Sequence, residues 1–196
     1  MRSVEGKYGT CWYYGKDEYV GRSIHNYGEF SPDECAGLLE LAGEMGTANR
    51  LVLDIGANIG FISQMFNANG YEVIAFEPQP AIFALLERNF KGGKHNCALG
   101  NSEGMIDMPR IDYSRKGNFG GVSVDTRGPL GRISVPIKTL DSFEFQRVGL
   151  IKLDVEGYEE LVLRGGEATI LRDKPILYVE DDRINNTVKL RHYIKS

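Results

Sequence analysis

The sequence LVLDIGANIGFIS, residues 51–63, decides the fold. Its first five residues are apolar except for Asp54 and rich in strand formers, which predicts a short buried strand. The two glycines of Gly56–Gly60 predict a turn, and a helical pattern of apolar residues then runs as far as Gly70. A strand, a glycine turn and a helix in this order are typical of the first unit of a parallel sheet that binds a nucleotide.

The residues of this turn favour one ligand over another. A dinucleotide-binding turn carries glycine at two further positions, where this chain has Asn58 and Phe61. Asp54 places a carboxylate at the end of the strand, which attracts a cation and repels a phosphate. S-adenosylmethionine carries an ammonium and a sulfonium and no phosphate. The turn therefore predicts S-adenosylmethionine as the cofactor in preference to NAD.

Length and composition are those of one globular domain. The chain has 196 residues, of which 42% are hydrophobic and 26% charged. The net charge of −4 argues against nucleic acid as the main partner. We find no signal segment and no run of about 18 apolar residues, so we expect no membrane association. The three cysteines lack metal-binding spacing, which predicts reduced thiols in a cytoplasmic protein.

Residues 8–30 are dense in aromatic side chains. Breaks such as Gly21 predict short strands here, as a hairpin over one end of the sheet. An ordinary packed hairpin fits this segment, and so does a lid from which Tyr27 and Glu29 reach the cofactor. His25 is a candidate general base, although a structural histidine is the commoner case.

A helix is predicted to begin at Ser31-Pro32-Asp33-Glu34. Serine is a favoured N-cap, proline suits the first helical position, and Glu34 can close a capping box. We expect residues 1–48 to form the N-terminal hairpin and this capping helix, and residues 49–182 to form the core.

Glu77 stands at the end of a second predicted strand, residues 71–76, about 20 residues after Gly56. An acid at this position hydrogen-bonds to ribose hydroxyls in nucleotide-binding sheets. A third strand is predicted over residues 94–99, with its end passing the adenine. The candidates for contact with adenine are Asn96, Cys97 and Ala98.

Residues 101–147 interrupt the α/β alternation. Glycines separate short β-prone pieces, including residues 122–124, which predicts an inserted β-hairpin and no crossover helix. The loop Asn118–Gly121 either faces a substrate or makes a plain hairpin turn. Strands over residues 149–155 and 175–179, with a helical stretch between them, then restore the parallel sheet.

These elements predict an α/β fold, a Rossmann-like, doubly wound and mostly parallel sheet in a single domain. The ligand crevice of such a sheet lies at the carboxyl ends of its strands. Only a short tail, residues 183–196, follows the last predicted strand. We therefore expect the sheet to be trimmed at one edge, with C-terminal strands missing.

Several separated motifs point to one family. They are Tyr27-Gly28-Glu29, Asp54–Gly60, Phe76–Pro78, Ala98–Gly100, Gly120–Ser123, Thr139–Ser142 and Ile151–Glu159. With these motifs the chain resembles the FkbM-type S-adenosylmethionine-dependent methyltransferases over about residues 18–182. The K-x-D-x-E-G-x-E pattern of Ile151–Glu159 is the most specific of them. The resemblance implies methyl transfer to a hydroxyl of a sugar or other secondary metabolite.

The predicted cofactor site gathers residues from the strand ends and the N-terminal segment. Its members are Tyr27, Glu29, Asp54, Gly56, Ala57, Asn58, Gly60, Phe61, Glu77, Pro78, Asn96, Cys97, Ala98 and Asp154. The expected partner is a small-molecule or glycan acceptor, and a homo-oligomer is compatible with the sequence. A non-catalytic or inactive homologue that binds the same cofactor is the alternative.

Asp154 is the predicted catalytic residue near the methyl group, supported by Glu156 or Lys152, with His25 as a further candidate base. Asp154 could instead cap the helix that begins near Tyr158 while pairing with Lys152. A divalent cation held by four acids is another alternative, since carboxylate oxygens are hard ligands; the predicted site itself contains no metal. Those four acids are Asp154, Glu156, Glu180 and Asp181.

Overall fold

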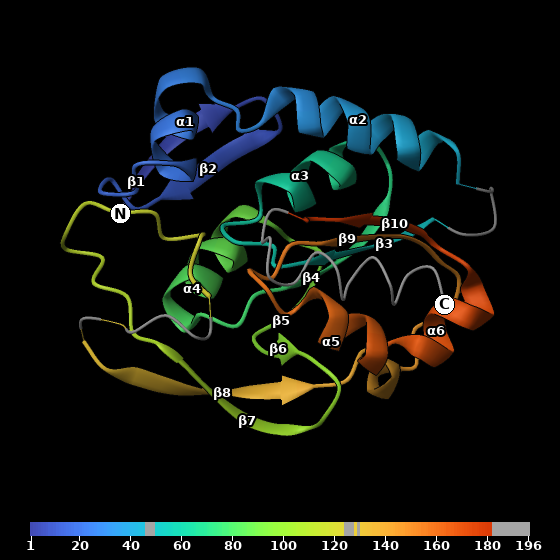
Figure 1. Ribbon diagram of the computed structural model, residues 1–196. Coiled ribbons are helices and arrows are strands. Elements are labelled where there is room, and N and C mark those ends of the chain that lie inside the picture. The colour runs from blue at the N-terminus through green and yellow to red at the C-terminus, as the bar shows by residue number, and fades with distance from the viewer. Residues whose placement is uncertain (46–49, 124–127, 129, 182–196) are drawn as a thin grey trace.

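The computed structural model describes residues 1–45, 50–123, 128 and 130–181. Its centre is a five-stranded sheet in the order β10-β9-β3-β4-β5, in which every pair of neighbours is parallel (Figure 1). The strands are β3 (Leu51–Ile55), β4 (Glu72–Phe76), β5 (Gly93–His95), β9 (Val148–Leu153) and β10 (Ile176–Val179). The order reverses at β3, as it does in doubly wound sheets.

Helices cover both faces of this sheet, so the predicted doubly wound α/β class is confirmed. Figure 1 shows α2 and α3 above the sheet and α5 and α6 below it. The helices are α2 (Pro32–Gly43), α3 (Phe61–Ala68), α4 (Pro80–Asn89), α5 (Glu159–Gly165) and α6 (Glu167–Asp173). Val52 of β3 packs into the core that α2, α3 and α4 share, whereas Leu53 and Ile55 pack into the core on the α5 side. Burial on both faces explains why β3 is an almost continuous apolar run.

The N-terminal segment differs from the prediction. A hairpin is present, formed by β1 (Arg2–Gly6) and β2 (Gly9–Tyr13), but residues 20–27 form a helix, α1 (Val20–Tyr27), and not strands. Val20 and Ile24 are four residues apart and both buried, which is helical spacing. Gly21 is no breaker: a Cβ there would lie 2.8 Å from Cβ of Asp17, so the site has room only for glycine.

The side chain of Asn89 ties this hairpin to the glycine turn. Its Oδ1 accepts a hydrogen bond from the Trp12 amide at 2.6 Å, and its Nδ2 donates to the Trp12 carbonyl at 2.9 Å. The same Nδ2 donates to the carbonyl of Ile59 at 2.7 Å. One buried amide therefore connects β2, α4 and the turn that follows β3.

The start of α2 is as predicted, but its cap is not. The helix begins at Pro32, and Ser31 at the N-cap position has a left-handed φ of 47° and makes no side-chain capping bond. The predicted capping box is therefore wrong. Glu34 instead lines the pocket at the carboxyl ends of the strands.

The insertion forms a small second sheet, in the order β6-β8-β7. Its strands are β6 (Ala98–Leu99), β7 (Gly104–Pro109) and β8 (Arg132–Lys138), and a 3-10 turn η1 (Asp141–Phe143) follows. The antiparallel pair β7–β8 confirms the inserted hairpin. Of the strand predicted over residues 122–124, Val122 and Ser123 are not in a strand, and Val124 lies outside the described residues.

The predicted third strand over residues 94–99 is split in two. Its first half is β5 at the edge of the main sheet, and its second half is β6 in the second sheet. Asn96 lies between them, where its Nδ2 donates to the carbonyls of Glu77 and Pro78 at 2.8 and 3.1 Å. These bonds hold the chain where it turns from one sheet to the other.

At the opposite edge, β10 is the outermost strand that the described residues contribute. The predicted tail, residues 183–196, lies outside the described residues, and the expected loss of C-terminal strands stays a prediction. In the part of the chain that the structure describes, we find no helix of the length and apolarity that a membrane crossing requires. Cys11, Cys35 and Cys97 are buried free thiols.

Replacing Gly56 by alanine should destabilise the fold more than replacing Gly70. Both glycines have left-handed backbones, with φ of 78° and 83°, so either substitution should cost about 1–2 kcal/mol of strain. At Gly56 a Cβ would also lie 1.7 Å from the Asp154 carbonyl oxygen, whereas nothing lies within 4 Å at Gly70. We expect Gly56→Ala to lose at least about 2 kcal/mol more than Gly70→Ala in urea unfolding. Equal losses would contradict this close approach.

Candidate active site

A pocket opens at the carboxyl ends of the central strands, where the fold class places its ligands. Most of the predicted site residues line it: Gly56, Ala57, Asn58, Phe61, Glu77, Pro78, Cys97, Ala98, Lys152, Asp154 and Glu156. The predicted residues outside its lining are His25, Tyr27, Glu29, Asp54, Gly60 and Asn96.

The glycine turn is held by backbone hydrogen bonds. The amides of Gly56 and Ala57 both donate to the carbonyl of Phe76, at 3.0 and 2.9 Å. Asn58 adopts a left-handed φ of 51°, and its Oδ1 accepts from the amide of Ile59 at 2.8 Å. The turn is therefore tied to the end of β4 before any ligand enters.

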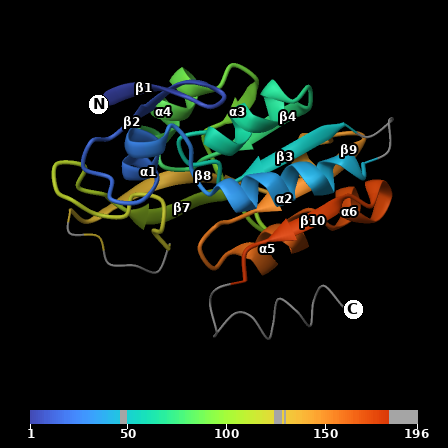
Figure 2. The same ribbon diagram turned by 90° about the horizontal axis from the view of Figure 1, so that it is seen from above.

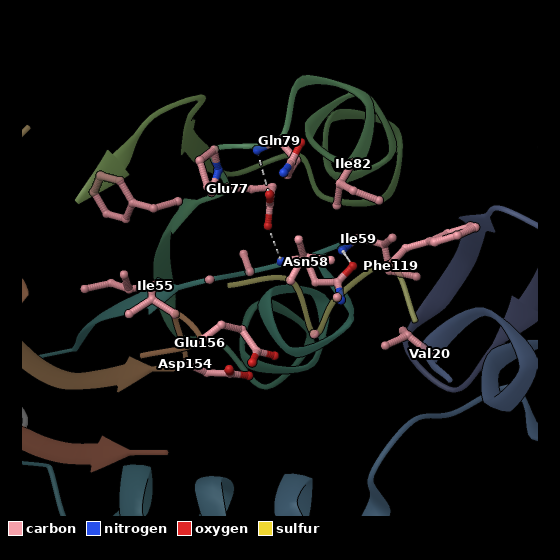
Figure 3. Close-up of a pocket in the computed structure, with 18 of the residues that line it drawn as sticks. Val20, Ile55, Asn58, Ile59, Glu77, Gln79, Ile82, Phe119, Asp154 and Glu156 are labelled. Carbon is pink, nitrogen blue, oxygen red and sulfur yellow. Dashed lines mark hydrogen bonds between the residues drawn. The ribbon is translucent and has the colours of Figure 1, made fainter. Parts of the chain in front are cut away.

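Glu77 projects from the end of β4 into the pocket, where two backbone amides orient its carboxylate (Figure 3). Oε2 accepts from the amide of Asn58 at 3.1 Å, and Oε1 accepts from the amide of Gln79 at 2.8 Å. Each oxygen retains a lone pair for a ligand hydroxyl. Burial raises the pKa of Glu77 to about 7, against the opposing effect of these amides.

Asp54 does not face the pocket, contrary to the prediction. Its side chain is fully buried, with Oδ2 accepting from the Ser63 hydroxyl at 2.5 Å and Oδ1 lying 3.7 Å from Nζ of Lys152. Burial raises the pKa of Asp54, and the Lys152 ammonium opposes this. Asp54 thus compensates a buried lysine and makes no direct contact with the pocket.

Lys152 joins the turns that follow β3 and β9. Its Nζ donates to the Gly56 carbonyl at 3.1 Å and to Oδ2 of Asp154 at 3.2 Å. Burial alone would lower the pKa of Lys152, but the carboxylates of Asp154 and Asp54 outweigh it and raise the pKa. The Lys152 ammonium therefore links the two turns by hydrogen bonds and lines the pocket.

The turn after β9 carries acidic side chains and contains two residues with left-handed backbone conformations. Glu156 and Gly157 have left-handed φ values of 58° and 104°. The carboxylate of Glu159 accepts from the amides of Val155 and Gly157 at 3.1 and 3.0 Å, which holds this turn. The N-cap residue of α5 is Tyr158 and not Asp154, whereas the predicted pairing of Asp154 with Lys152 is present at 3.2 Å.

Three carboxylates gather across the pocket from Glu77, on the side where Figure 3 shows Asp154 and Glu156. Oxygens of Asp154, Glu156 and Glu180 lie within 4.8 Å of one another, and Asp181 is outside this group. Such a group can accept a proton, bind an ammonium or hold a divalent cation. The prediction of a site without metal stays a prediction.

The N-terminal candidates lie away from the pocket. The His25 ring is exposed, with Nδ1 2.7 Å from the Tyr13 hydroxyl, and Glu29 pairs with Lys7 at 2.8 Å. Tyr27 is 75% exposed on α1. Other residues of the segment reach the pocket, namely Tyr19, Val20 and Phe30.

Sequence reasoning missed several contributors to the pocket lining, among them Glu34. Glu34 reaches it from α2, and its position in a capping-box pattern concealed this. Phe119 reaches it from the insertion, where the whole Asn118–Gly121 loop lines the pocket and favours the substrate-facing interpretation. Its ring packs edge-on against Tyr14 and Tyr113, so the insertion and the N-terminal segment meet at the rim.

The parallel sheet, the glycine turn and the pocket at the strand ends define a Rossmann-like fold with a ligand site. Residues 54–195 match the profile described as the Methyltransferase FkbM domain, and the chain belongs to this family. "Methyltransferase 1" of Beauveria bassiana (strain ARSEF 2860) is 29% identical in an alignment of 143 positions that covers 58% of this chain and 57% of that protein.

A solved structure has the same fold. It is the methyltransferase FkbM of Methylobacillus flagellatus KT, with a TM-score of 0.55 and 19% identity. The alignment covers 78% of this chain and 38% of that one. The chain therefore spans little more than half of the curated relative and less than half of the solved one.

The raised pKa of Glu77 predicts a specific dependence of stability on pH. A carboxyl with a pKa near 4.5 when unfolded and about 7 when folded is bound more tightly to its proton in the folded state. Its contribution is present below pH 4.5 and is lost as the pH rises towards 7, by up to about 3 kcal/mol. In chemical denaturation at pH 5 and pH 8, Glu77→Gln should lose less stability than wild type over this interval. An identical pH dependence would show that Glu77 titrates normally.

Proposed function

We propose that the chain catalyses S-adenosylmethionine-dependent methyl transfer to a hydroxyl of a sugar or other small metabolite. Membership of the FkbM methyltransferase family supports the reaction class. The position of Glu77 supports the cofactor most directly, because its carboxylate enters the pocket already aligned by Asn58 and Gln79.

The lining of the pocket suits the adenosine half of this cofactor. The two oxygens of Glu77 can accept the two ribose hydroxyls, which both donate. Apolar side chains of the pocket lining offer a surface for the flat adenine, among them Ile82, Leu99 and Met108. NAD would bring a pyrophosphate to a turn where Asn58 and Phe61 stand in place of glycines, and where the lining is acidic.

The acids on the other side of the pocket suit the transfer step. When bound, S-adenosylmethionine would supply a methyl group on positively charged sulfur. The acceptor oxygen then bonds to the methyl carbon, the carbon–sulfur bond breaks with its electrons passing to sulfur, and the hydroxyl proton leaves. Asp154 is the proposed acceptor of that proton, with Glu156 beside it and Lys152 fixing its orientation.

A non-catalytic cofactor-binding protein is the second candidate. The ion pair between Asp154 and Lys152, at 3.2 Å, favours it, since a carboxylate paired with an ammonium is a weaker base. Cofactor binding is common to both candidates, and turnover separates them.

Cofactor binding is tested by calorimetric titration of S-adenosylhomocysteine and NAD into the protein. We expect the first to bind and the second to bind much more weakly. Glu77→Gln should weaken binding of S-adenosylhomocysteine by about tenfold or more, because it removes a charged acceptor from the ribose. Glu72→Gln, an exposed site at the other end of β4, is the matched control. Preference for NAD, or unchanged affinity in Glu77→Gln, would count against the proposal.

Methyl transfer is tested with methyl-labelled S-adenosylmethionine and a panel of glycosides. Asp154→Asn should lower kcat by about 100-fold while changing affinity for S-adenosylhomocysteine little, because it removes the proton acceptor. Asp107→Asn, on the exposed side of β7, is the control. Turnover that survives EDTA would support the metal-free site. Binding without turnover of any glycoside would favour the non-catalytic candidate.

A further inference from the structure

Three side chains form a row across the central strands. Asp54 of β3 is the register partner of Lys152 in β9, and Lys152 is the register partner of Tyr178 in β10. Register partners project from the same face of a parallel sheet, so this row lies on the face that α2 covers. In Figure 2, α2 crosses this part of the sheet, and it packs against β10 and α3.

Glu34, in the first turn of α2, stands over this row. It lines the pocket together with Lys152, whereas its neighbour Asp33 is exposed to solvent. Burial raises the pKa of Tyr178 most, and next the Glu34 carboxylate raises it by its charge and by a side-chain hydrogen bond. It also acts on Lys152, behind the two stronger contributions of Asp154 and Asp54.

The carboxylates that line the pocket outnumber its basic side chains. Lys152 is the only basic side chain among the described residues that line the pocket. Lys152 already forms ion pairs with Asp54, which is fully buried, and with Asp154. Glu34 adds a further carboxylate at the same place, and the N-terminal end of α2 favours its negative charge.

We propose that Glu34 binds the ammonium of the amino-acid part of the cofactor. The inference rests on the proposed function and assigns to Glu34 the task that Asp54 cannot perform from its buried position. Glu34 precedes residue 54, where the family match begins, so the N-terminal segment supplies a cofactor contact of its own. Ammonium and carboxylate form a charge-assisted hydrogen bond, which is stronger than a neutral one.

Three ligands that differ only in the amino-acid part test this assignment. S-adenosylhomocysteine has the ammonium and the carboxylate, S-adenosyl-3-thiopropylamine has the ammonium alone, and 5′-methylthioadenosine has neither. Titration calorimetry of wild type and Glu34→Gln with each ligand isolates the group that Glu34 recognises. We expect Glu34→Gln to weaken the first two by about tenfold or more and to leave the third within about threefold.

Asp33→Asn, which removes a charge from the same helical turn outside the pocket, should change none of the three affinities. Thermal unfolding of each variant checks the fold, and Glu34→Ala replaces Glu34→Gln if the latter unfolds. An equal loss for all three ligands, no loss, or a loss confined to S-adenosylhomocysteine would overturn the assignment of Glu34. Failure of wild type to bind any of the three would overturn the proposed function itself.

Discussion

The buried ammonium of Lys152 is the constraint on which the rest of the site depends. A charge removed from water must be compensated by neighbours, and here they are the Asp54 and Asp154 carboxylates and the Gly56 carbonyl. These groups belong to the ends of two adjacent strands, β3 and β9. Satisfying one lysine therefore brings together the two turns that line the pocket floor.

The approach of these turns also depends on a missing side chain. The Asp154 carbonyl lies where a Cβ of Gly56 would be, so the two strand ends can meet only at glycine. After β9 the chain passes through Glu156 and Gly157, which both have left-handed backbone conformations. The Glu159 carboxylate accepts hydrogen bonds from two backbone amides of this turn. Backbone shape and buried charge thus act on the same few residues.

The sequence predicted the parts of the site that follow from strand ends. Glu77 and Asp154 could be placed at one edge, because the carboxyl ends of parallel strands meet there whatever the rest of the chain does. Glu34 could not be placed, because an acid three residues after a serine has a sufficient local explanation as a capping box. The groups on which its charge acts, Lys152 and Tyr178, are over a hundred residues away in the chain.

The same limit explains the errors in the fold. Glycine is a poor helix former, so Gly21 predicts a break, but its contacts with Asp17 and Tyr14 leave room for nothing larger within the helix. Asp54 was assigned to the ligand because its strand end was predicted correctly, whereas the choice between pocket and interior depended on Lys152. For Asp54 a distant partner overrode the local pattern, whereas for Gly21 the deciding contacts lie within the same N-terminal segment.

The hydrogen bonds of the Asn89 side chain join the N-terminal hairpin to the rest of the domain. The family profile matches from residue 54, yet Asn89, inside the matched region, makes two hydrogen bonds to the backbone of Trp12 and a third to the carbonyl of Ile59. A polypeptide that began at residue 54 would lose two of these three hydrogen bonds, next to the glycine turn. The fold therefore includes the hairpin, which precedes the residues that the family profile matches.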